Sequence, residues 1–440
     1  MPVAAYSDVA TALLEPYGNI ERLVHIASSE QPSASGDKPW LAKHASHHTR
    51  WTVSSTGQLS EHGHGSVDTQ LDVIIDDVTE GLPSRLVTLW PRLKPGGAYL
   101  FPLEPAVVAG VRAWIFALSG RLGMEAPGHL HRNYMGKTTK WYHLGSQELA
   151  KYPLPSHASF LFCAASGCGV AKVGPCDCIP AANEIKACAN AKPPFAPALA
   201  ACNTSSWRNA NAFALARTGM SLRPICDKID HSAYHVMYGA LLTPLASTLR
   251  SSNRPLRLFE VGLGCDQGYG PGASVALWKR HYQGLELWEA EYNEACVKAS
   301  RARGQLQDVF TVTGDQGDPA VLKGWREAMG NASFDAVIDD GGHKNSQKGA
   351  TFDWFWPATN PGGVYFIEDM HVDYMSHYED TNGKAIFTDV VRDWLSQLAG
   401  VSINNATGKP FDGRRQLPAE TRFIACQTRA CAIGKARAGA

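Results

Sequence analysis

The chain has 440 residues, which is more than one hydrophobic core usually serves, so we expect two domains. Its 44% hydrophobic and 19% charged residues are typical of a globular protein and exclude a disordered chain. The 41 basic and 41 acidic side chains balance, so there is no net field to attract nucleic acid or anionic lipid, and we expect neither as a partner.

The same sequence bears on the compartment. No apolar run approaches the roughly 18 to 20 residues needed to span a bilayer, and the first residues lack a basic segment followed by an apolar core. We therefore expect a cytoplasmic protein without a membrane anchor. The eleven cysteines form no CxxC pairs at zinc spacing, and their odd number leaves at least one thiol free.

The first 175 residues contain several apolar runs that predict strands. They include LVHIASS, LDVIIDDVTE at 71–80, and SFLFCAASGCGVAK at 159–172. The stretch 176–230 is instead rich in Ala, Pro, Asn and Cys, a composition that indicates a linker or an irregular excursion.

From about residue 254 the pattern becomes regular. Strand candidates ending in acidic or small residues (RPLRLFEVGLG, LELWEAE, VFTVTGDQGD, FDAVIDDGGH and GGVYFIEDMH) alternate with helical segments such as GASVALWKRHY. This alternation predicts an α/β fold with a mostly parallel, doubly wound sheet. Ligands of such sheets bind at the carboxyl ends of the strands, where the acidic residues fall.

The two halves also resemble each other. LDVIIDD with LWPRLKPGGAYLF matches FDAVIDD with FWPATNPGGVYFI, and the cysteine spacing of SFLFCAASGCGVAK matches that of RFIACQTRACAIGK. We infer a tandem pair of domains, residues 1–175 and 231–440, separated by 176–230.

The turn after the first strand of the second half has the character of a cofactor site. Gly262 and Gly264 let backbone approach a ligand, and a helix beginning near Ala273 or Ser274 offers free N–H groups. The GxGxxG spacing of dinucleotide enzymes is absent, which argues against an oxidoreductase. Glu291 or Glu289, at the next strand end, is positioned to bind ribose hydroxyls, and Asp315 to bind the adenine side.

Carboxylates also end the last two strands of this pattern. Asp339 and Asp340 end one strand, and Glu368 and Asp369 end the next, so these groups are expected to converge. Converging carboxylates repel one another unless a cation lies among them. Oxygen ligands without a thiolate favour Mg²⁺, with Mn²⁺ or Ca²⁺ as alternatives. His343 is placed to remove a proton from a substrate hydroxyl.

These motifs give the second half a resemblance to the metal-dependent S-adenosylmethionine sugar O-methyltransferases of the mycinamicin and tetracenomycin type. The resemblance covers roughly residues 235–400 and rests on EVGLG, GDQGD, DDGGH and PGGVYFIEDMH. It implies a Rossmann-like class I methyltransferase fold, S-adenosylmethionine and Mg²⁺ as cofactors, and a small hydroxylated molecule, such as a sugar, as acceptor. It also implies an oligomeric assembly, either a homo-oligomer or an internal pseudo-dimer of the two halves.

The resemblance also implies residue roles. His343 would be the general base, and the metal ligands would be Asp340, Glu368 and Asp369. The residues expected at the cofactor are Glu260, Gly262, Gly264, Ser274, Glu291, Asp315, Gln316 and Asp339.

The first half keeps the scaffold but not this site. Asp76 and Asp77 remain, whereas Glu80 stands where the second half has His343, and Pro102 and Leu103 stand at the positions of the last carboxylate pair. We therefore expect the first domain to be catalytically silent. The alternative for the whole chain is a non-catalytic binding or scaffold protein built from two decayed domains.

Two cysteine pairs remain open. Cys163 and Cys168, and likewise Cys426 and Cys431, flank a four-residue loop within a hairpin-like stretch. They are expected either as small buried thiols, the slightly favoured alternative, or as disulfides.

Overall fold

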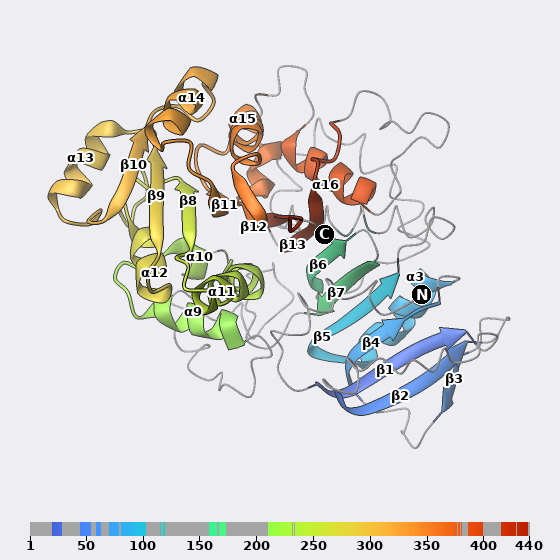
Figure 1. Cartoon of the computed structure of the whole chain (residues 1–440). Helices are drawn as coiled ribbons and strands as arrows, with labels where there is room; N and C mark the ends of the chain where they lie inside the picture. The colour runs from blue at the N-terminus through green and yellow to red at the C-terminus, as the bar shows by residue number, and fades with distance from the viewer. Residues whose placement is uncertain are drawn as a thin grey trace.

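The computed structural model describes residues 20–28, 45–53, 59–62, 70–78, 81–102, 115, 118, 158–164, 167–172, 210–230, 232, 234–375, 377–378, 380, 386–398, 415–427 and 429–438. These residues form a 14-stranded sheet with helices on both faces (Figure 1). The strand order is β10-β9-β8-β11-β12-β14-β13-β6-β7-β5-β4-β1-β2-β3.

The first half of the chain supplies seven of these strands. They are β1 (Ile20–Ser28), β2 (Ala45–Val53), β3 (Leu59–His62), β4 (Leu71–Asp76), β5 (Leu93–Pro102), β6 (Ala158–Ala164) and β7 (Gly167–Lys172). The second half supplies β8 (Arg257–Val261), β9 (Glu286–Glu291), β10 (Val309–Thr313), β11 (Phe334–Asp339), β12 (Thr359–Ile367), β13 (Thr421–Gln427) and β14 (Ala430–Lys435).

The sheet is mixed rather than mostly parallel. β8 to β12 pair in parallel, as do β1, β2, β4 and β5. Strands β14, β13, β6 and β7 pair antiparallel and join the two parallel regions. Both cysteine-containing segments were expected to be hairpin-like, but the sequence did not indicate that the two hairpins pair with each other and insert between the parallel regions.

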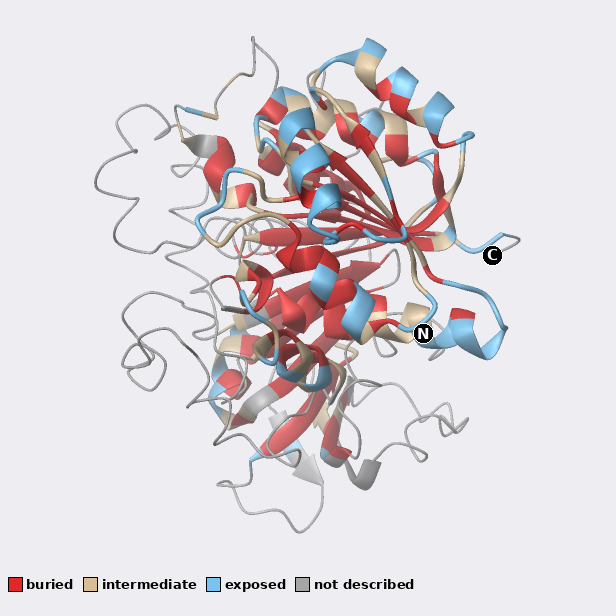
Figure 2. Ribbon diagram, turned by 90° about the vertical axis from the view of Figure 1, so that its left-hand side faces the viewer, coloured by how far each residue is buried: buried red, intermediate tan, exposed pale blue. Residues whose placement is uncertain are grey.

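Every residue of the central strands β4 and β11 is buried. Their sequences LDVIID and FDAVID are nearly continuous apolar runs, as is typical of parallel strands covered on both faces. Figure 2 shows this arrangement, with the strands buried and many helices exposing only their outer faces. The α/β class predicted from the sequence is therefore confirmed.

Two hydrophobic clusters lie on opposite faces of the sheet. One contains side chains of α3 (Leu82–Leu89), α14 (Pro319–Ala328), α15 (Asn345–Phe355) and α16 (Phe387–Leu398). The other contains side chains of α9 (Ala210–Met220), α11 (His235–Ser251), α12 (Ala273–His281) and α13 (Glu294–Ala302). The short helices are η3 (Trp90–Arg92), α10 (Asp227–Asp230) and η5 (Met370–Tyr374).

Part of the stretch expected as a linker, 176–230, belongs to the folded core. Residues 210–230 contain α9 and α10, and Leu215, Cys226 and Ile229 are buried in the second cluster. The irregular composition that suggested a linker lies mainly before residue 210, and 173–209 are outside the described residues. α9 packs against α11 and α12 of the second half.

When the sheet is followed inward from either edge, the strands of each half come in the same order, which is third, second, first, fourth, fifth, seventh and sixth along that half. One end gives β10-β9-β8-β11-β12-β14-β13, and the other gives β3-β2-β1-β4-β5-β7-β6. The two halves meet where β13 pairs antiparallel with β6. Ala425 lies opposite Phe162, and the rings of Phe162 and Phe423 stack with centroids 4.7 Å apart.

Candidate active site

The glycine-rich turn follows β8 directly. Gly262 has φ +113° and Gly264 has φ +78°, conformations that L side chains rarely adopt. The turn leads to α12, which begins at Ala273 after Gly272 and contains the buried Ser274. The N-terminal end of α12 thus stands beyond the glycine turn, as the sequence predicted.

Of the two glutamates proposed for the ribose, Glu291 lies at the turn. Its carboxylate accepts hydrogen bonds from the amides of Leu263 (3.2 Å) and Asn293 (3.0 Å), which ties the end of β9 to the end of β8. Glu289 is instead buried in the sheet opposite Glu260. Burial, together with the adjacent Glu260, raises the pKa of Glu289 well above its usual range.

The side chain of Glu260, in β8, likewise points toward the helices that cover the sheet. It is fully buried and accepts a hydrogen bond of 3.0 Å from the indole N–H of Trp278. Its backbone carries the turn, but its side chain faces the interior of the α11 and α12 layer. A direct cofactor contact by the Glu260 carboxylate, expected from the sequence, therefore has no support in this geometry.

Gln316 and Asp339 are held in internal contacts. The amide nitrogen of Gln316 donates to Asp339 and to Thr351, both over 3.0 Å, and its oxygen accepts from the amide of Gly342 over 2.8 Å. These bonds use both amide donors of Gln316 and one acceptor site of its oxygen, so the side chain supports the loop after β11. Burial raises the pKa of Asp339 to about 6.

Asp315 is the exposed member of the group expected at the cofactor. Its carboxylate accepts from the Gly317 amide (2.8 Å) and from the side chain of Gln347 (3.0 Å). One of its oxygens thus organises the turn that follows β10. The exposed position of Asp315 leaves it accessible to a ligand at the carboxyl ends of the strands.

The two glycines of DDGGH are required by close packing. A Cβ on Gly341 would lie 1.8 Å from the side-chain oxygen of Gln316, and one on Gly342 would lie 2.2 Å from that of Gln347. His343 then adopts φ +60°. This compact loop turns the histidine back toward the strand ends.

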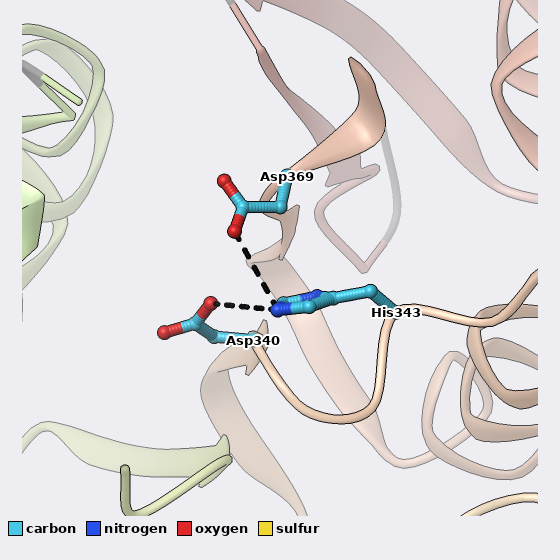
Figure 3. Close-up of side chains that lie close together, drawn as sticks. All are labelled: Asp340, His343 and Asp369. Carbon is cyan, nitrogen blue, oxygen red and sulfur yellow. Dashed lines mark ion pairs between the residues drawn. The ribbon is translucent and has the colours of Figure 1, made fainter. Parts of the chain in front are cut away.

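Asp340, His343 and Asp369 converge at the carboxyl ends of β11 and β12 (Figure 3). The Nε2 atom of His343 is 3.5 Å from an Asp369 oxygen and 4.0 Å from an Asp340 oxygen. One ligand atom from each of the three residues lies within 4.8 Å of the others. Burial lowers the pKa of His343 to about 4, so the imidazole is neutral at pH 7 and can accept a proton.

Asp369 has φ +50°, and Tyr234 anchors its carboxylate through a hydrogen bond of 2.7 Å. Burial alone would raise the pKa of Asp369, but His343, His371 and the bond from Tyr234 outweigh it and lower this pKa to about 2. Asp369 is therefore ionised throughout the neutral range.

Glu368 is not one of these three convergent residues. Its carboxylate accepts hydrogen bonds from the Tyr238 hydroxyl and from Lys228 Nζ, the latter over 2.7 Å. Lys228 also donates to Asp340 over 2.5 Å. Asp340 and Glu368 thus share one ammonium group, and the residues predicted to surround a metal ion instead have a lysine between two of them.

The sequence interpretation missed Lys228, Tyr234 and Tyr238. All three come from the stretch around α10 and the start of α11, where the composition gave no strand, glycine turn or known motif. Charge balance was the one available signal, because several buried carboxylates require a cation and α10 carries the basic residue. Assigning Lys228 from that signal needs the fold.

The donor set fits a divalent ion in its chemistry. Asp340 and Asp369 offer hard carboxylate oxygens beside the His343 nitrogen, with no thiolate among these ligand atoms. Glu368 fits less well as arranged, because both of its oxygens already accept hydrogen bonds.

Disulfides occur at three places in the described residues. Cys163–Cys168 and Cys426–Cys431 each cross a hairpin between directly paired residues, so the slightly favoured expectation of buried thiols was wrong. Cys265–Cys296 links the residue after Gly264 to α13. This third bridge, which the sequence did not indicate, ties the glycine turn to the helix that follows Glu291.

The corresponding region of the first half has different chemistry. Asp76 is bound by Arg85 (2.9 Å) and Tyr99 (2.5 Å), and Asp77 is 2.5 Å from His25. Glu80 and Leu103, the positions at which the sequence shows loss of the site, lie outside the described residues.

Within the described part of the chain, every helix is too short or too polar to cross a lipid bilayer.

No protein-family model matches the sequence. The chain is similar to the 8-demethyl-8-alpha-L-rhamnosyl tetracenomycin-C 2'-O-methyltransferase of Streptomyces olivaceus, with 30% identity over 162 residues, 37% of this chain and 39% of that protein. It is also similar to the mycinamicin VI 2''-O-methyltransferase of Micromonospora griseorubida, with 33% identity over 127 residues, 28% of this chain and 29% of that protein.

The chain thus spans less than two fifths of the length of these two relatives. A solved methyltransferase from the mycinamycin biosynthetic pathway, in complex with Mg and SAH, matches with a TM-score of 0.34 and 20% identity over 47% of this chain and 57% of that chain. The sequence similarities make this chain a distant homologue of O-methyltransferases over about a third of its length.

Proposed function

We propose that the chain is an S-adenosylmethionine- and divalent-metal-dependent O-methyltransferase that methylates a hydroxyl group of a small, glycosylated acceptor. The observation that carries this proposal is the convergence of Asp340, His343 and Asp369 at the strand ends, beside the glycine turn of β8. Homology to O-methyltransferases supports the reaction type, and a relative that acts on a rhamnosyl tetracenomycin supports a sugar hydroxyl as acceptor.

The cofactor would bind at the carboxyl ends of β8 and β9. Gly262 and Gly264 open the backbone there, Ser274 lies in the first turn of α12, and Glu291 and Asp315 end the neighbouring strand regions. S-adenosylmethionine, when bound, supplies an electrophilic methyl group on a sulfonium. Gln316 and Asp339 act indirectly, by fixing the loop that carries His343.

Asp340 and Asp369 would hold the metal ion, with Glu368 available once it is released from Lys228. Mg²⁺ is the preferred ion and Mn²⁺ the alternative; when bound, it supplies positive charge that makes an acceptor hydroxyl more acidic.

His343 removes the proton of that hydroxyl. Its Nε2 atom faces the two aspartates and the open strand ends, so this nitrogen is the proton acceptor. Asp369 stabilises the imidazolium that forms, because its carboxylate stays ionised at 3.5 Å from Nε2. General-base catalysis of this kind contributes about 10² to 10⁴ in rate.

We further propose that residues 1–175 form a degenerate copy of the same domain and that the two copies pack as an internal pseudo-dimer. Equivalent backbone contacts support the duplication. Asp77 N donates to Ile26 O over 3.0 Å, and Asp340 N donates to Val261 O over 2.9 Å. The bulge between Leu71 and Val73 recurs between the matching residues of β11.

Two matching lysines add to this support. Lys172 donates to the carbonyls of Trp90 and Leu93, and Lys435 donates to those of Trp356 and Thr359. The contact between β6 and β13 is self-complementary, because Ala425 pairs with Phe162 and these two residues correspond to each other in the repeat. The first copy would be silent, since His25 and Arg85 already occupy its aspartates.

The test is a transfer assay on the full chain with labelled S-adenosylmethionine, Mg²⁺ and a panel of glycosylated small molecules. We expect label in a chelator-sensitive product, and we expect His343→Ala to lose at least about 100-fold in turnover while cofactor affinity is retained. His371→Ala is the matched control. His371 also lies beside Asp369, at 3.9 Å, but the described ion pairs do not join it to Asp340. Absence of S-adenosylmethionine binding in calorimetry would favour the alternative, a non-catalytic binding protein.

A further inference from the structure

Lys228 is a buried lysine whose ammonium group is surrounded by carboxylates. Its side chain is 1% exposed, and Nζ lies 2.5 Å from Asp340, 2.7 Å from Glu368 and 3.3 Å from Glu260. The ammonium group donates hydrogen bonds to Asp340 and Glu368 and forms an ion pair with Glu260. The group therefore lies at the point where the sequence predicted a metal ion.

The surrounding segment fixes this lysine in place. The Lys228 amide donates to Asp227 over 2.9 Å, and its carbonyl accepts from the Tyr234 amide over 2.8 Å. Six residues later the same segment supplies Tyr234, which binds Asp369, and then Tyr238, which binds Glu368. One continuous stretch thus organises the acidic residues of the site.

We propose that Lys228 is the resident cation of this site and that a divalent metal ion engages Asp340 and Glu368 only by displacing its ammonium group. This inference rests on the function proposed above and adds a residue that sets the metal affinity. Lys228 is a positioning residue, because it acts through the two carboxylates.

The physical reason is competition between two cations for the same pair of carboxylates. Mg²⁺ and Mn²⁺ need short contacts to carboxylate oxygens, and a divalent ion on Asp340 would stand next to the ammonium already bound there. Two cations at that separation in a buried site repel strongly. Without either cation, Asp340 and Glu368 would repel each other and take up protons. The site therefore favours one cation at a time between these two residues.

The first experiment measures Mn²⁺ binding to the full chain by calorimetry without cofactor or acceptor. We expect Lys228→Met to bind Mn²⁺ at least about tenfold more tightly than the wild type and to gain more thermal stability from the ion, because metal binding to the folded state raises its stability. Lys228→Arg should keep the weak affinity, because it keeps the charge. Adding Asp340→Asn to Lys228→Met should remove the gain.

Lys348→Met is the matched control. Lys348 is equally buried, pairs with Asp373 over 2.6 Å and donates to the backbone carbonyl of Asp369 over 2.9 Å, whereas the two carboxylates that share Lys228 are not among its partners. Its loss should lower stability without tightening Mn²⁺ binding. Equal or weaker Mn²⁺ binding by Lys228→Met than by the wild type, or no binding by either protein, would overturn the proposal.

A second experiment uses the wild-type chain and so does not depend on the folding of a variant. Lysines are acetylated with acetic anhydride with and without millimolar Mn²⁺, and the extent at Lys228 is read by peptide mass spectrometry. We expect acetylation of Lys228 to increase several-fold with Mn²⁺, while Lys348 stays protected. No increase at Lys228 under conditions where calorimetry shows Mn²⁺ bound contradicts displacement.

The two proposals fail separately. A chain that binds Mn²⁺ as described but transfers no methyl group would refute the proposed reaction and leave the role of Lys228 intact. A chain that transfers methyl groups, with metal affinity unchanged by Lys228→Met, would refute the role of Lys228 and leave the proposed reaction intact.

Discussion

Gly262 packs against the backbone of Asp340 so closely that a Cβ on Gly262 would lie 2.0 Å from the Asp340 carbonyl oxygen. The contact joins the cofactor turn to the proposed metal ligand. We predict that Gly262→Ala lowers the free energy of unfolding by roughly 2 to 4 kcal/mol, because both φ +113° and this contact exclude a side chain. It should also weaken S-adenosylmethionine binding. Urea unfolding and calorimetry measure the two effects.

Gly268→Ala is the control for this substitution. Gly268 lies in the same loop, and a Cβ there would meet no atom within 4 Å. Its free energy of unfolding should stay within about 0.5 kcal/mol of the wild type. Similar losses in the two variants would show that the loop, rather than the contact with Asp340, sets the stability.

Much of the second half could be predicted because its signals are local. The apolar run FDAVIDD predicts a strand independently of its surroundings. The acidic residues that end β11 and β12 lie close together because these strands are parallel neighbours. The similarity of the two halves was visible in the sequence because both contain local patterns such as the Pro-Gly-Gly turn.

The parts that escaped prediction depend on distant contacts. Lys228 lies 112 residues before Asp340, and nothing in DKID indicates that its lysine enters the sheet layer. Cys265 and Cys296 are 31 residues apart without a recognisable spacing. Glu260 ends a strand in the sequence, yet side chains alternate between the faces of a strand, and the face to which Glu260 points depends on the packing of α11 and α12.

Asp340 and Asp77 occupy equivalent positions in the two halves, which provides a matched pair of variants. We predict that Asp340→Asn raises the Mg²⁺ concentration needed for half-maximal activity at least about tenfold, because loss of even an outer partner of a metal site has effects of that size. Asp77→Asn should leave activity and metal requirement unchanged, since Asp77 pairs with His25 at 2.5 Å. Metal titrations of the transfer rate measure both. A shift in the Asp77 variant would contradict a silent first domain.

The Cys265–Cys296 bridge should stabilise the fold and the cofactor turn together. It joins residues 31 apart, for which chain entropy predicts a loss of roughly 3 to 4 kcal/mol when Cys265 and Cys296 are both changed to Ser. We also expect weaker S-adenosylmethionine binding, because the bridge holds the turn after Gly264 against α13. The matched control changes Cys426 and Cys431 to Ser. Their disulfide joins residues only 5 apart, so its loss should lower the free energy of unfolding by about 2 kcal/mol without affecting cofactor binding. Equal cofactor affinity in all three proteins would refute the link.

His235 gives the fold a defined sensitivity to acid. It is 3% exposed at the start of α11, and burial lowers its pKa from 6.5 to about 4. Below pH 6.5 the unfolded state takes up a proton at this imidazole, whereas the folded state keeps it neutral until about pH 4. The folded state is therefore at its full stability above pH 6.5 and loses stability as the pH falls from 6.5 to about 4. Between about pH 7.5 and about pH 5 the loss should be on the order of 2 kcal/mol.

The residue-specific part of this acid sensitivity can be isolated with His235→Gln, which carries no titrating group. Urea unfolding at the two pH values should show that the variant loses about 2 kcal/mol less than the wild type on acidification. His377→Gln is the control, because His377 is exposed and should leave the pH dependence unchanged. Parallel pH profiles for the wild type and His235→Gln would mean that the imidazole gains compensating contacts when protonated, and that acid unfolding of this chain begins elsewhere.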